Sequence, residues 1–168
     1  TISVTVSDGI STTVRAFLVT VNPVNDAPIA TDISVATDED VPLVIVLVPL
    51  YASDVDGNPL TLTVGLPTNG AATADGVTIA YTPTLNFVGD DVFTYTVQDP
   101  DGLQATAWIT VQVGGVNDAP VAVDDAFTTD EDIPLTLDVL SNDSDVEGQT
   151  LFLTAVGTPL LGQVTIAG

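Results

Sequence analysis

The chain has 168 residues, of which 23 are Asp or Glu and only one, Arg15, is basic; it contains no His, and its net charge is −22. A chain this acidic cannot neutralise phosphates, which excludes nucleic acid as a partner and argues against binding to anionic membrane surfaces. Because 45% of the residues are hydrophobic, the composition still favours a folded protein over a disordered acidic tail. Cys is absent, so disulfides neither stabilise the fold nor indicate the compartment.

The sequence contains an internal repeat. The segment Val24–Pro28 returns unchanged as Val116–Pro120, 92 positions later, and Asp38–Leu43 is matched by Asp130–Leu135 at the same offset. A fixed period of this length is typical of tandem arrays, in which each period is one folding unit.

This period divides the chain into three expected segments. Residues 1–22 match the last two strands of the central unit and are assigned to a preceding repeat. Residues 23–114 are expected to form a complete repeat, and residues 115–168 the N-terminal part of a following one. Both chain ends are then cuts in a longer array, and exchange of the first two strands between molecules is the less favoured alternative.

The predicted elements of the complete repeat are short β-strands. Polar and apolar residues alternate with a period of two, Thr and Val dominate, and Gly, Pro, Asn and Asp punctuate the runs. The predicted strands cover residues 29–37, 42–48, 59–65, 71–74, 77–82, 91–97 and 104–113. Seven short antiparallel strands in one period predict an all-β fold, a two-sheet sandwich.

The acidic residues fall in the connections between these strands. Successive antiparallel strands place their connections alternately at the two ends of a sandwich. The end that carries the linker before the complete repeat is called here the upstream end, and the opposite one the downstream end. The expected upstream group is Asn25, Asp26, Asp54, Asp56 and Asp99. The expected downstream group, with the residues of the next unit that would face it, is Asp38, Glu39, Asp40, Asp90, Asp91, Asn117, Asp118, Asp143, Asp145 and Glu147.

So many carboxylates without a Lys or Arg nearby indicate a bound cation, because uncompensated negative charge opposes a compact state. Oxygen donors with no Cys or His suit Ca²⁺ better than Zn²⁺ or copper, and Mg²⁺ rarely uses an all-protein cage. All fifteen residues of the two groups are therefore predicted metal ligands. Taken singly, each acidic turn is better explained as a solvated loop, and the case for metal rests on their coincidence at one junction.

The motifs resemble those of a known family. Asn117-Asp118-Ala119-Pro120 looks like the linker between cadherin repeats, and Ser53–Gly57 looks like the cadherin Asp-x-Asp turn. The whole combination resembles the cadherin-like and Ig-like repeats of giant bacterial surface adhesins of the RTX type, secreted by type I systems. The cadherin Asp-Arg-Glu motif has no clear match, and the number of ions at each junction stays open.

This resemblance implies tandem seven-stranded Greek-key β-sandwiches, Ig-like or cadherin-like, joined head to tail. It also implies an extracellular, cell-surface stalk that Ca²⁺ stiffens and that serves in cell adhesion or biofilm formation. The implied partners are the neighbouring repeats of the same chain, and cell-surface or glycan ligands would bind through other domains. No direct insertion into a membrane is expected.

Two other functions were weighed. Catalysis is disfavoured because the chain lacks the His, Cys and Lys that activate nucleophiles. The alternative is a carbohydrate- or partner-binding module of a secreted protein. Trp108 is out of phase with Ile109 and Val111, so its indole is expected on the outer face of the last strand, where it could stack on a sugar. Ala16 occupies the matching position in residues 1–22.

Overall fold

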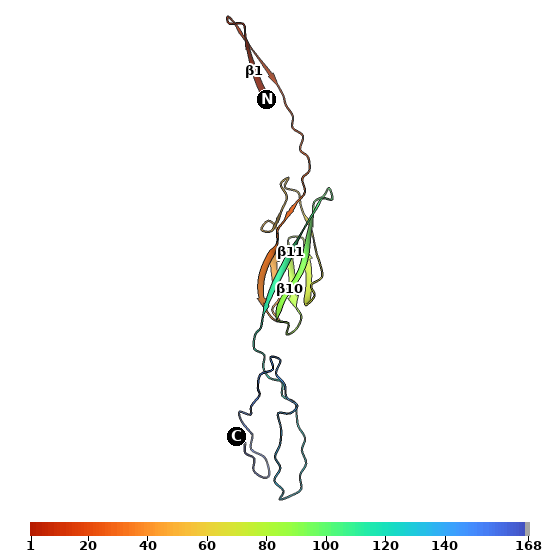
Figure 1. The fold of residues 1–168 in the computed structure, drawn as a ribbon, viewed down its shortest axis with the longest axis vertical. Helices are drawn as coiled ribbons and strands as arrows, with labels where there is room; N and C mark the ends of the chain where they lie inside the picture. The colour runs from red at the N-terminus through yellow and green to blue at the C-terminus, as the bar shows by residue number, and fades with distance from the viewer. Residues whose placement is uncertain (167–168) are drawn as a thin grey trace.

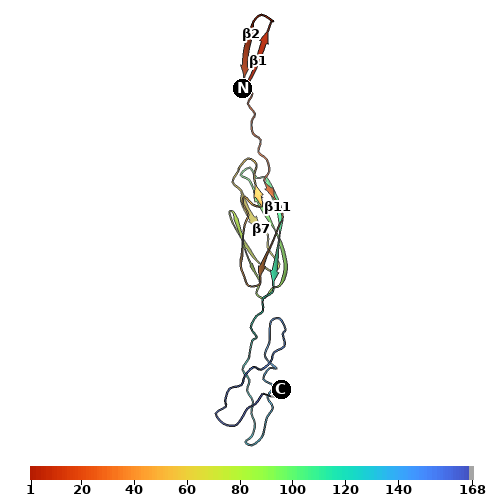
Figure 2. The same ribbon diagram turned by 90° about the vertical axis from the view of Figure 1, so that its left-hand side faces the viewer.

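The computed structural model describes residues 1–166, so Ala167 and Gly168 of the predicted third segment lie outside it. Figures 1 and 2 show three segments in a row: a β-hairpin, a central β-sandwich, and a run of extended loops. The strands are β1 (Ile2–Ser7), β2 (Thr12–Phe17), β3 (Ile29–Ala30), β4 (Ile33–Asp38), β5 (Leu43–Val46), β6 (Ala52–Ser53), β7 (Thr61–Val64), β8 (Gly70–Asp75), β9 (Thr78–Pro83), β10 (Gly89–Gln98) and β11 (Gln104–Gly114).

The central sandwich has two main sheets. One has the strand order β4-β11-β10-β7 and the other the order β5-β9-β8, while the short strands β3 and β6 pair with each other. No helix occurs among residues 1–166. The predicted all-β fold of tandem sandwiches is confirmed.

The predicted strand 29–37 differs in the structure, because it breaks into β3 and β4. The break lies beside a buried hydroxyl: the Thr31 N–H lies 3.1 Å from Tyr95 Oη, and the same hydroxyl lies 2.7 Å from the Thr31 carbonyl oxygen. After the break β4 joins the other sheet and runs parallel to β11, with Ile33 opposite Ile109. The expectation of purely antiparallel pairing is therefore wrong for this pair of strands.

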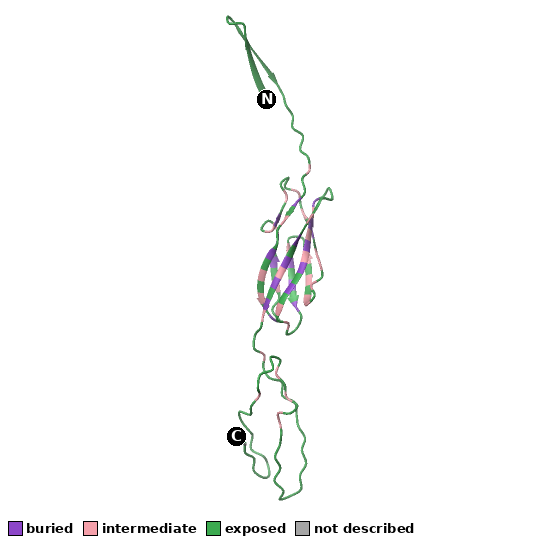
Figure 3. Cartoon of the chain, viewed as in Figure 1, coloured by how far each residue is buried: buried purple, intermediate pink, exposed green. Residues whose placement is uncertain are grey.

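The alternating residues of the long strands form the core. In β10, Phe93, Tyr95 and Val97 point inward, and the rings of Phe93 and Tyr81 stack with centroids 5.6 Å apart. The buried residues of the hydrophobic core lie between positions 33 and 113. Figure 3 shows this burial confined to the central sandwich. The core fixes the strands, and the strands place the acidic loops at the two ends.

The flanking segments carry the same pattern without a core. The hairpin β1–β2 pairs Ile2 with Phe17, in the manner of Phe93 and Ile109 in β10–β11. Residues 115–166 contain one isolated bridge, Val121 to Ser144, which corresponds to the pairing of β3 with β6. The apolar side chains of both segments are largely exposed, because no facing sheet covers them among the described residues.

Candidate functional site at the ends of the sandwich

The linker before the sandwich is docked on the upstream loops. The Asp26 N–H donates to Asp56 Oδ2 at 2.8 Å, and the Asp56 N–H donates to Asp54 Oδ1 at 2.8 Å. Gly57 has a φ of 74°, a left-handed conformation that glycine adopts without strain and that closes the Asp54–Gly57 turn. Hydrogen bonding within the turn thus holds the carboxylates of Asp54 and Asp56 beside the linker.

Asn25 joins the linker to two further loops. Its Nδ2 group donates to Asp99 Oδ2 at 2.7 Å, and its Oδ1 accepts from Asn58 Nδ2 at 2.8 Å. Asp99 follows β10 and is buried, and its other oxygen accepts from the Leu103 N–H. The structure therefore brings the whole predicted upstream group to one end of the sandwich: Asn25, Asp26, Asp54, Asp56 and Asp99.

The same arrangement recurs at the next linker. The Asp118 N–H donates to Glu147 Oε1 at 3.0 Å, and the Glu147 N–H donates to Asp145 Oδ1 at 3.1 Å. The Gln149 amide donates to Asn117 Oδ1, as Asn58 does to Asn25. Each of the two copies of the motif thus forms this same set of hydrogen bonds, even though residues 115–166 form no sheet.

At the downstream end two carboxylates accept hydrogen bonds from backbone N–H groups. Glu39 is only 5% exposed, and its Oε1 accepts from the Val116 N–H at 2.7 Å, so it holds the outgoing linker. Asp40 has a φ of 60° and accepts from the Asn86 N–H at 3.0 Å. A pocket at this junction is lined by residues of both units, among them Glu39 and Glu147. These two predicted ligands face one cavity.

Asp91 is a correction to the predicted site. Its side chain is 1% exposed and lies inside the sandwich, where its oxygens accept from the Thr68 N–H, the Asn69 N–H and the Tyr81 hydroxyl at 3.0, 2.9 and 3.0 Å. The position is in phase with the inward residues of β10, which is why it points into the protein. Asp91 therefore holds the segment before β8 and does not face the next unit.

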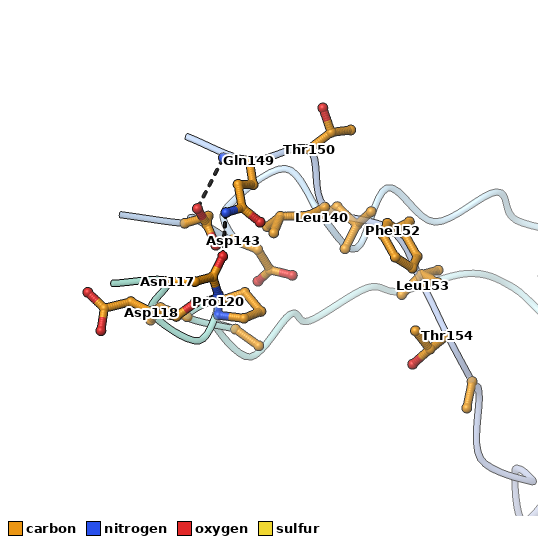
Figure 4. Close-up of a pocket in the computed structure, with 15 residues that line it drawn as sticks. Asn117, Asp118, Pro120, Leu140, Asp143, Gln149, Thr150, Phe152, Leu153 and Thr154 are labelled. Atoms are coloured by element: carbon orange, nitrogen blue, oxygen red, sulfur yellow. Dashed lines mark hydrogen bonds between the residues drawn. The ribbon is translucent and has the colours of Figure 1, made fainter. Parts of the chain in front are cut away.

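Asp143 is also engaged within its own unit. Its Oδ1 accepts from the Val123 N–H at 2.8 Å, which ties two extended segments of residues 115–166 together. It lines a cavity of about 420 Å³ (Figure 4) that has Asn117 and Gln149 at one end and Phe152 and Leu153 towards the other.

This cavity lies where the central sandwich has a packed core. Leu153 corresponds to Leu62 of β7; Leu62 is 8% exposed, whereas Leu153 is 43% exposed. In the sandwich β10 pairs with β7 in the same sheet, and Val97 lies beside Leu62. The cavity of residues 115–166 is therefore lined in part by residues whose counterparts pack in the core of the sandwich. Among the described residues, no neighbouring strand pairs with them.

The remaining predicted ligands, Asp38 and Asp90, are exposed at the downstream end. Among residues 1–166, no three acidic side chains gather closely enough to hold a metal ion. Two carboxylate oxygens are nevertheless buried without any hydrogen-bond partner, Asp54 Oδ2 and Asp118 Oδ2. They belong to the two equivalent linker motifs, one in each. Burying an unpaired anionic oxygen is costly.

Sequence reasoning missed Asn58 and Gln149, which hold the two linker amides. The sequence does contain a signal for these two residues. In both copies an amide residue follows the first Asp of the turn, Asp54 or Asp145, by four positions. Sequence reasoning also missed Tyr81, whose hydroxyl donates to Asp91. Burial and the adjacent carboxylate raise the pKa of Tyr81, so its phenol stays protonated and remains a donor.

The linker contact gives a prediction for acid pH. The Asn25 amide lowers the pKa of Asp99 below its usual value, and the Leu103 N–H adds to this effect while burial opposes it. Because the folded-state pKa is depressed, this carboxyl stabilises the fold above its unfolded pKa of about 4, and the contribution is lost as the pH falls through the folded value. Asn25→Ala should raise the pKa of Asp99 in an NMR titration of carboxyl carbons. Asp8, whose pKa is lowered by the N–H groups of Ser11 and Ile10, should not change; equal shifts at both would contradict the local cause.

Comparison with known families decides what the chain is. The family described as bacterial Ig domain matches it twice, over residues 25–112 and 117–168. The chain belongs to the bacterial Ig domain family. A comparison with curated proteins returned no match. The Ig domain fold is typical of non-catalytic modules. The described residues of this bacterial Ig protein contain no helix able to span a membrane. The domain boundaries inferred from the repeat remain a prediction.

Solved structures similar to this bacterial Ig chain include cadherins and parts of carbohydrate-active proteins. Drosophila N-cadherin EC1-4 matches at 18% identity, with a TM-score of 0.44, over 73% of this chain and 34% of that one. Protocadherin gamma B7 domains 1–4 match at 17% identity, with a TM-score of 0.40, over 64% and 30%. An endo-fucoidan hydrolase of glycoside hydrolase family 107 matches at 21% identity, with a TM-score of 0.47, over 71% and 20%. The chain thus spans between 20% and 34% of the length of these chains.

Proposed function

We propose that this chain is a non-catalytic stalk segment of an extracellular bacterial surface adhesin, in which Ca²⁺ bound between successive Ig units stiffens the array. The stalk would hold a distal binding domain away from the cell in adhesion or biofilm formation. Its direct partners are the neighbouring units of the same chain.

The observation that carries the proposal is the pair of buried, unpartnered oxygens, Asp54 Oδ2 and Asp118 Oδ2. Each belongs to a docked linker motif, and the chain's one basic residue, Arg15, lies in the hairpin β1–β2. A bound cation would supply the positive charge that such oxygens lack. The donor set consists of carboxylate and amide oxygens, which are ligands that Ca²⁺ accepts in flexible geometry.

The residues that would hold an ion at the downstream junction come from both units. Glu39 belongs to the sandwich, whereas Asp118, Asp145 and Glu147 follow it. On binding, these carboxylates would turn from their present backbone partners towards the shared charge. Rotation of one unit against the next would then break ligand bonds, and this is how the ion would stiffen the linker.

Without the ion, two backbone N–H groups of the linker are held by carboxylates at the junction. The Val116 N–H donates to the buried Glu39, a bond worth roughly 1.5–3 kcal/mol because the acceptor is charged. The Asp118 N–H donates to Glu147, which is exposed, so solvent screening makes this bond weaker. The carboxylates on either side repel each other at the same time. The proposal therefore expects a junction that is docked but loose in the absence of Ca²⁺.

The double variant Asp118→Ala plus Asp145→Ala tests this function. It should loosen the junction while the sandwich stays folded, because neither residue contributes to the core between positions 33 and 113. Small-angle scattering in Ca²⁺ should show a broader distribution of distances for the variant than for the wild type. In chelator the two proteins should give the same broad distribution.

The matched control is Asp124→Ala plus Asp125→Ala, which removes the same charge from exposed positions in the same unit. This control should keep the narrow distribution in Ca²⁺. If the wild type has equally narrow orientations with and without Ca²⁺, the stiffening role is wrong. Loss of all β signal in the Asp118/Asp145 variant would show that these residues belong to the core.

A further inference from the structure

The outer face of one sheet carries an exposed indole that the fold does not require. Trp108 lies on β11, in the interior of the sheet β4-β11-β10-β7, and its side chain is 55% exposed. Figure 1 shows β11 and β10 side by side along this face. The equivalent hairpin pairs Ser3 with Ala16 where this one pairs Thr94 with Trp108. The strand pairing thus forms equally well with a methyl group in place of the indole.

The surroundings of Trp108 are flat and hydroxyl-bearing. Thr94 lies opposite it on β10, and Gly65 lies beyond Thr94, since the Gly65 N–H donates to the Thr94 carbonyl at 2.8 Å. A Cβ at Gly65 would come within 2.9 Å of Thr94 Oγ1. The glycine therefore leaves the Thr94 hydroxyl uncovered. No side chain projects from position 65 on that side of the indole.

A row of threonines runs beside the indole across three strands. Thr96 of β10 pairs with Thr106 of β11 on one side and with Thr63 of β7 on the other. The Thr96 and Thr106 hydroxyl oxygens lie 2.8 Å apart in a hydrogen bond. A hydroxyl has one donor and two acceptor sites, so the pair keeps free acceptor capacity towards the solvent.

This surface, called here the Trp108 platform, consists of Trp108, Thr94, Thr96, Thr106 and Thr63 and carries no charge. In a chain of net charge −22 the acids of this outer face lie outside these five residues: Asp90, in phase with Thr94 on β10, is exposed at the downstream end. The nearest acid is Asp32, whose Oδ1 accepts the Trp108 backbone N–H at 2.9 Å. This bond fixes the backbone of β11 at the position that presents the indole.

We propose that the Trp108 platform binds a neutral glycan. An uncharged sugar ring offers an apolar C–H face that can stack on the indole and hydroxyls that can bond to the threonine row. The charge of the chain selects against acidic polysaccharides, which would be repelled. Trp combines a large apolar surface with little conformational entropy to lose, which makes it a frequent anchor in recognition sites. The platform shares no residue with the acidic ends, so binding needs no Ca²⁺.

Trp108 is the only Trp in the chain, so its fluorescence reports directly on the platform. Titration with neutral oligosaccharides built from glucose, mannose, galactose or N-acetylglucosamine should give a saturable blue shift with at least one of them. Oligogalacturonate, which is acidic, should give none. The shift should be the same in Ca²⁺ and in chelator. Absence of any shift across the neutral panel at millimolar concentration would overturn the proposal.

Variants separate the platform from the rest of the surface. By calorimetry, Trp108→Ala should weaken binding of the responding sugar by about tenfold or more, as expected for an anchoring Trp. Thr96→Ala should weaken it less. Val44→Ala is the matched control, because Val44 is an exposed apolar residue of β5 on the other sheet, and it should bind as the wild type does.

A second copy of this chain is the competing occupant of the same face. Sedimentation of the sugar-free protein distinguishes the two cases. The proposal expects a monomer at all concentrations for both the wild type and Trp108→Ala. Concentration-dependent association that disappears in Trp108→Ala would assign the platform to self-association and would overturn the glycan proposal.

Discussion

Excess Ca²⁺ should raise the melting temperature of this chain by roughly 10–20 °C for each occupied site. Binding to the folded state alone adds about 2.7 kcal/mol when free Ca²⁺ is a hundred times its dissociation constant. For a unit of this size, each kcal/mol corresponds to about 4–8 °C. Extracellular modules bind Ca²⁺ with dissociation constants down to about 10⁻⁴ M, so roughly 10 mM Ca²⁺ supplies this excess. Thermal melts followed by circular dichroism, in Ca²⁺ and in chelator, measure the shift.

General screening of the negative charge has to be separated from site binding. Mg²⁺ at equal concentration and NaCl at equal ionic strength should each give a much smaller rise than Ca²⁺. Asp54→Asn keeps an oxygen for the Asp56 N–H contact but removes the charge of the buried, unpartnered Oδ2. It should lose part of the Ca²⁺ response. Asp75→Asn removes a charge from the exposed last residue of β8 and should keep the full response. Equal melting temperatures in Ca²⁺ and in chelator would remove calcium from the proposed function.

Asp91→Ala should destabilise the sandwich by about 3–5 kcal/mol. The substitution leaves two backbone N–H groups and the Tyr81 hydroxyl, all now bonded to this carboxylate, without an acceptor. Each unpaired buried donor costs about 1–3 kcal/mol. The loss should be the same in Ca²⁺ and in chelator, because the partners are groups of the protein. Denaturant unfolding under both conditions provides the measurement.

The neighbouring residue supplies a matched control. Asp90→Ala removes the same charge from an exposed position on the same strand, and in chelator its effect on the free energy of unfolding should stay within about 0.5 kcal/mol. Tyr81→Phe removes one of the three donors and should cost about 1 kcal/mol. If Asp91→Ala instead reduced stability only in Ca²⁺, the carboxylate would be a metal ligand, as the sequence alone suggested.

The sequence predicts most of this fold because the strand signal is local. The alternation in β10 and β11 identifies both strands, and the turn residues separate the others. The break between β3 and β4 is not predictable in this way, because it depends on the hydroxyl of Tyr95, which is 64 positions from Thr31. The two-residue strand β6 is too short to show a period. Parallel pairing of β4 with β11 follows from that break and could not be inferred without it.

The candidate site shows the same division between local and distant information. Turn chemistry and topology were sufficient to gather Asn25, Asp26 and Asp99 at one end. The grouping of acids at the downstream end misplaces Asp91, because this residue is in phase with the inward residues of β10. Its role depends on Thr68 and Tyr81, which approach from other strands. The metal assignments of the remaining acids stay predictions.

The docking of each linker has a consequence for the gene. Every side chain that holds Asn25 and Asp26 comes from the unit that follows them, namely Asp56, Asn58 and Asp99. Each unit therefore contains the side chains that bind the linker preceding it. These contacts do not depend on the sequence of the neighbouring unit. Unequal recombination between two copies of the coding sequence could add or remove whole units and keep every one of these upstream contacts. The length of such an array can vary through changes in copy number, with no compensating substitutions.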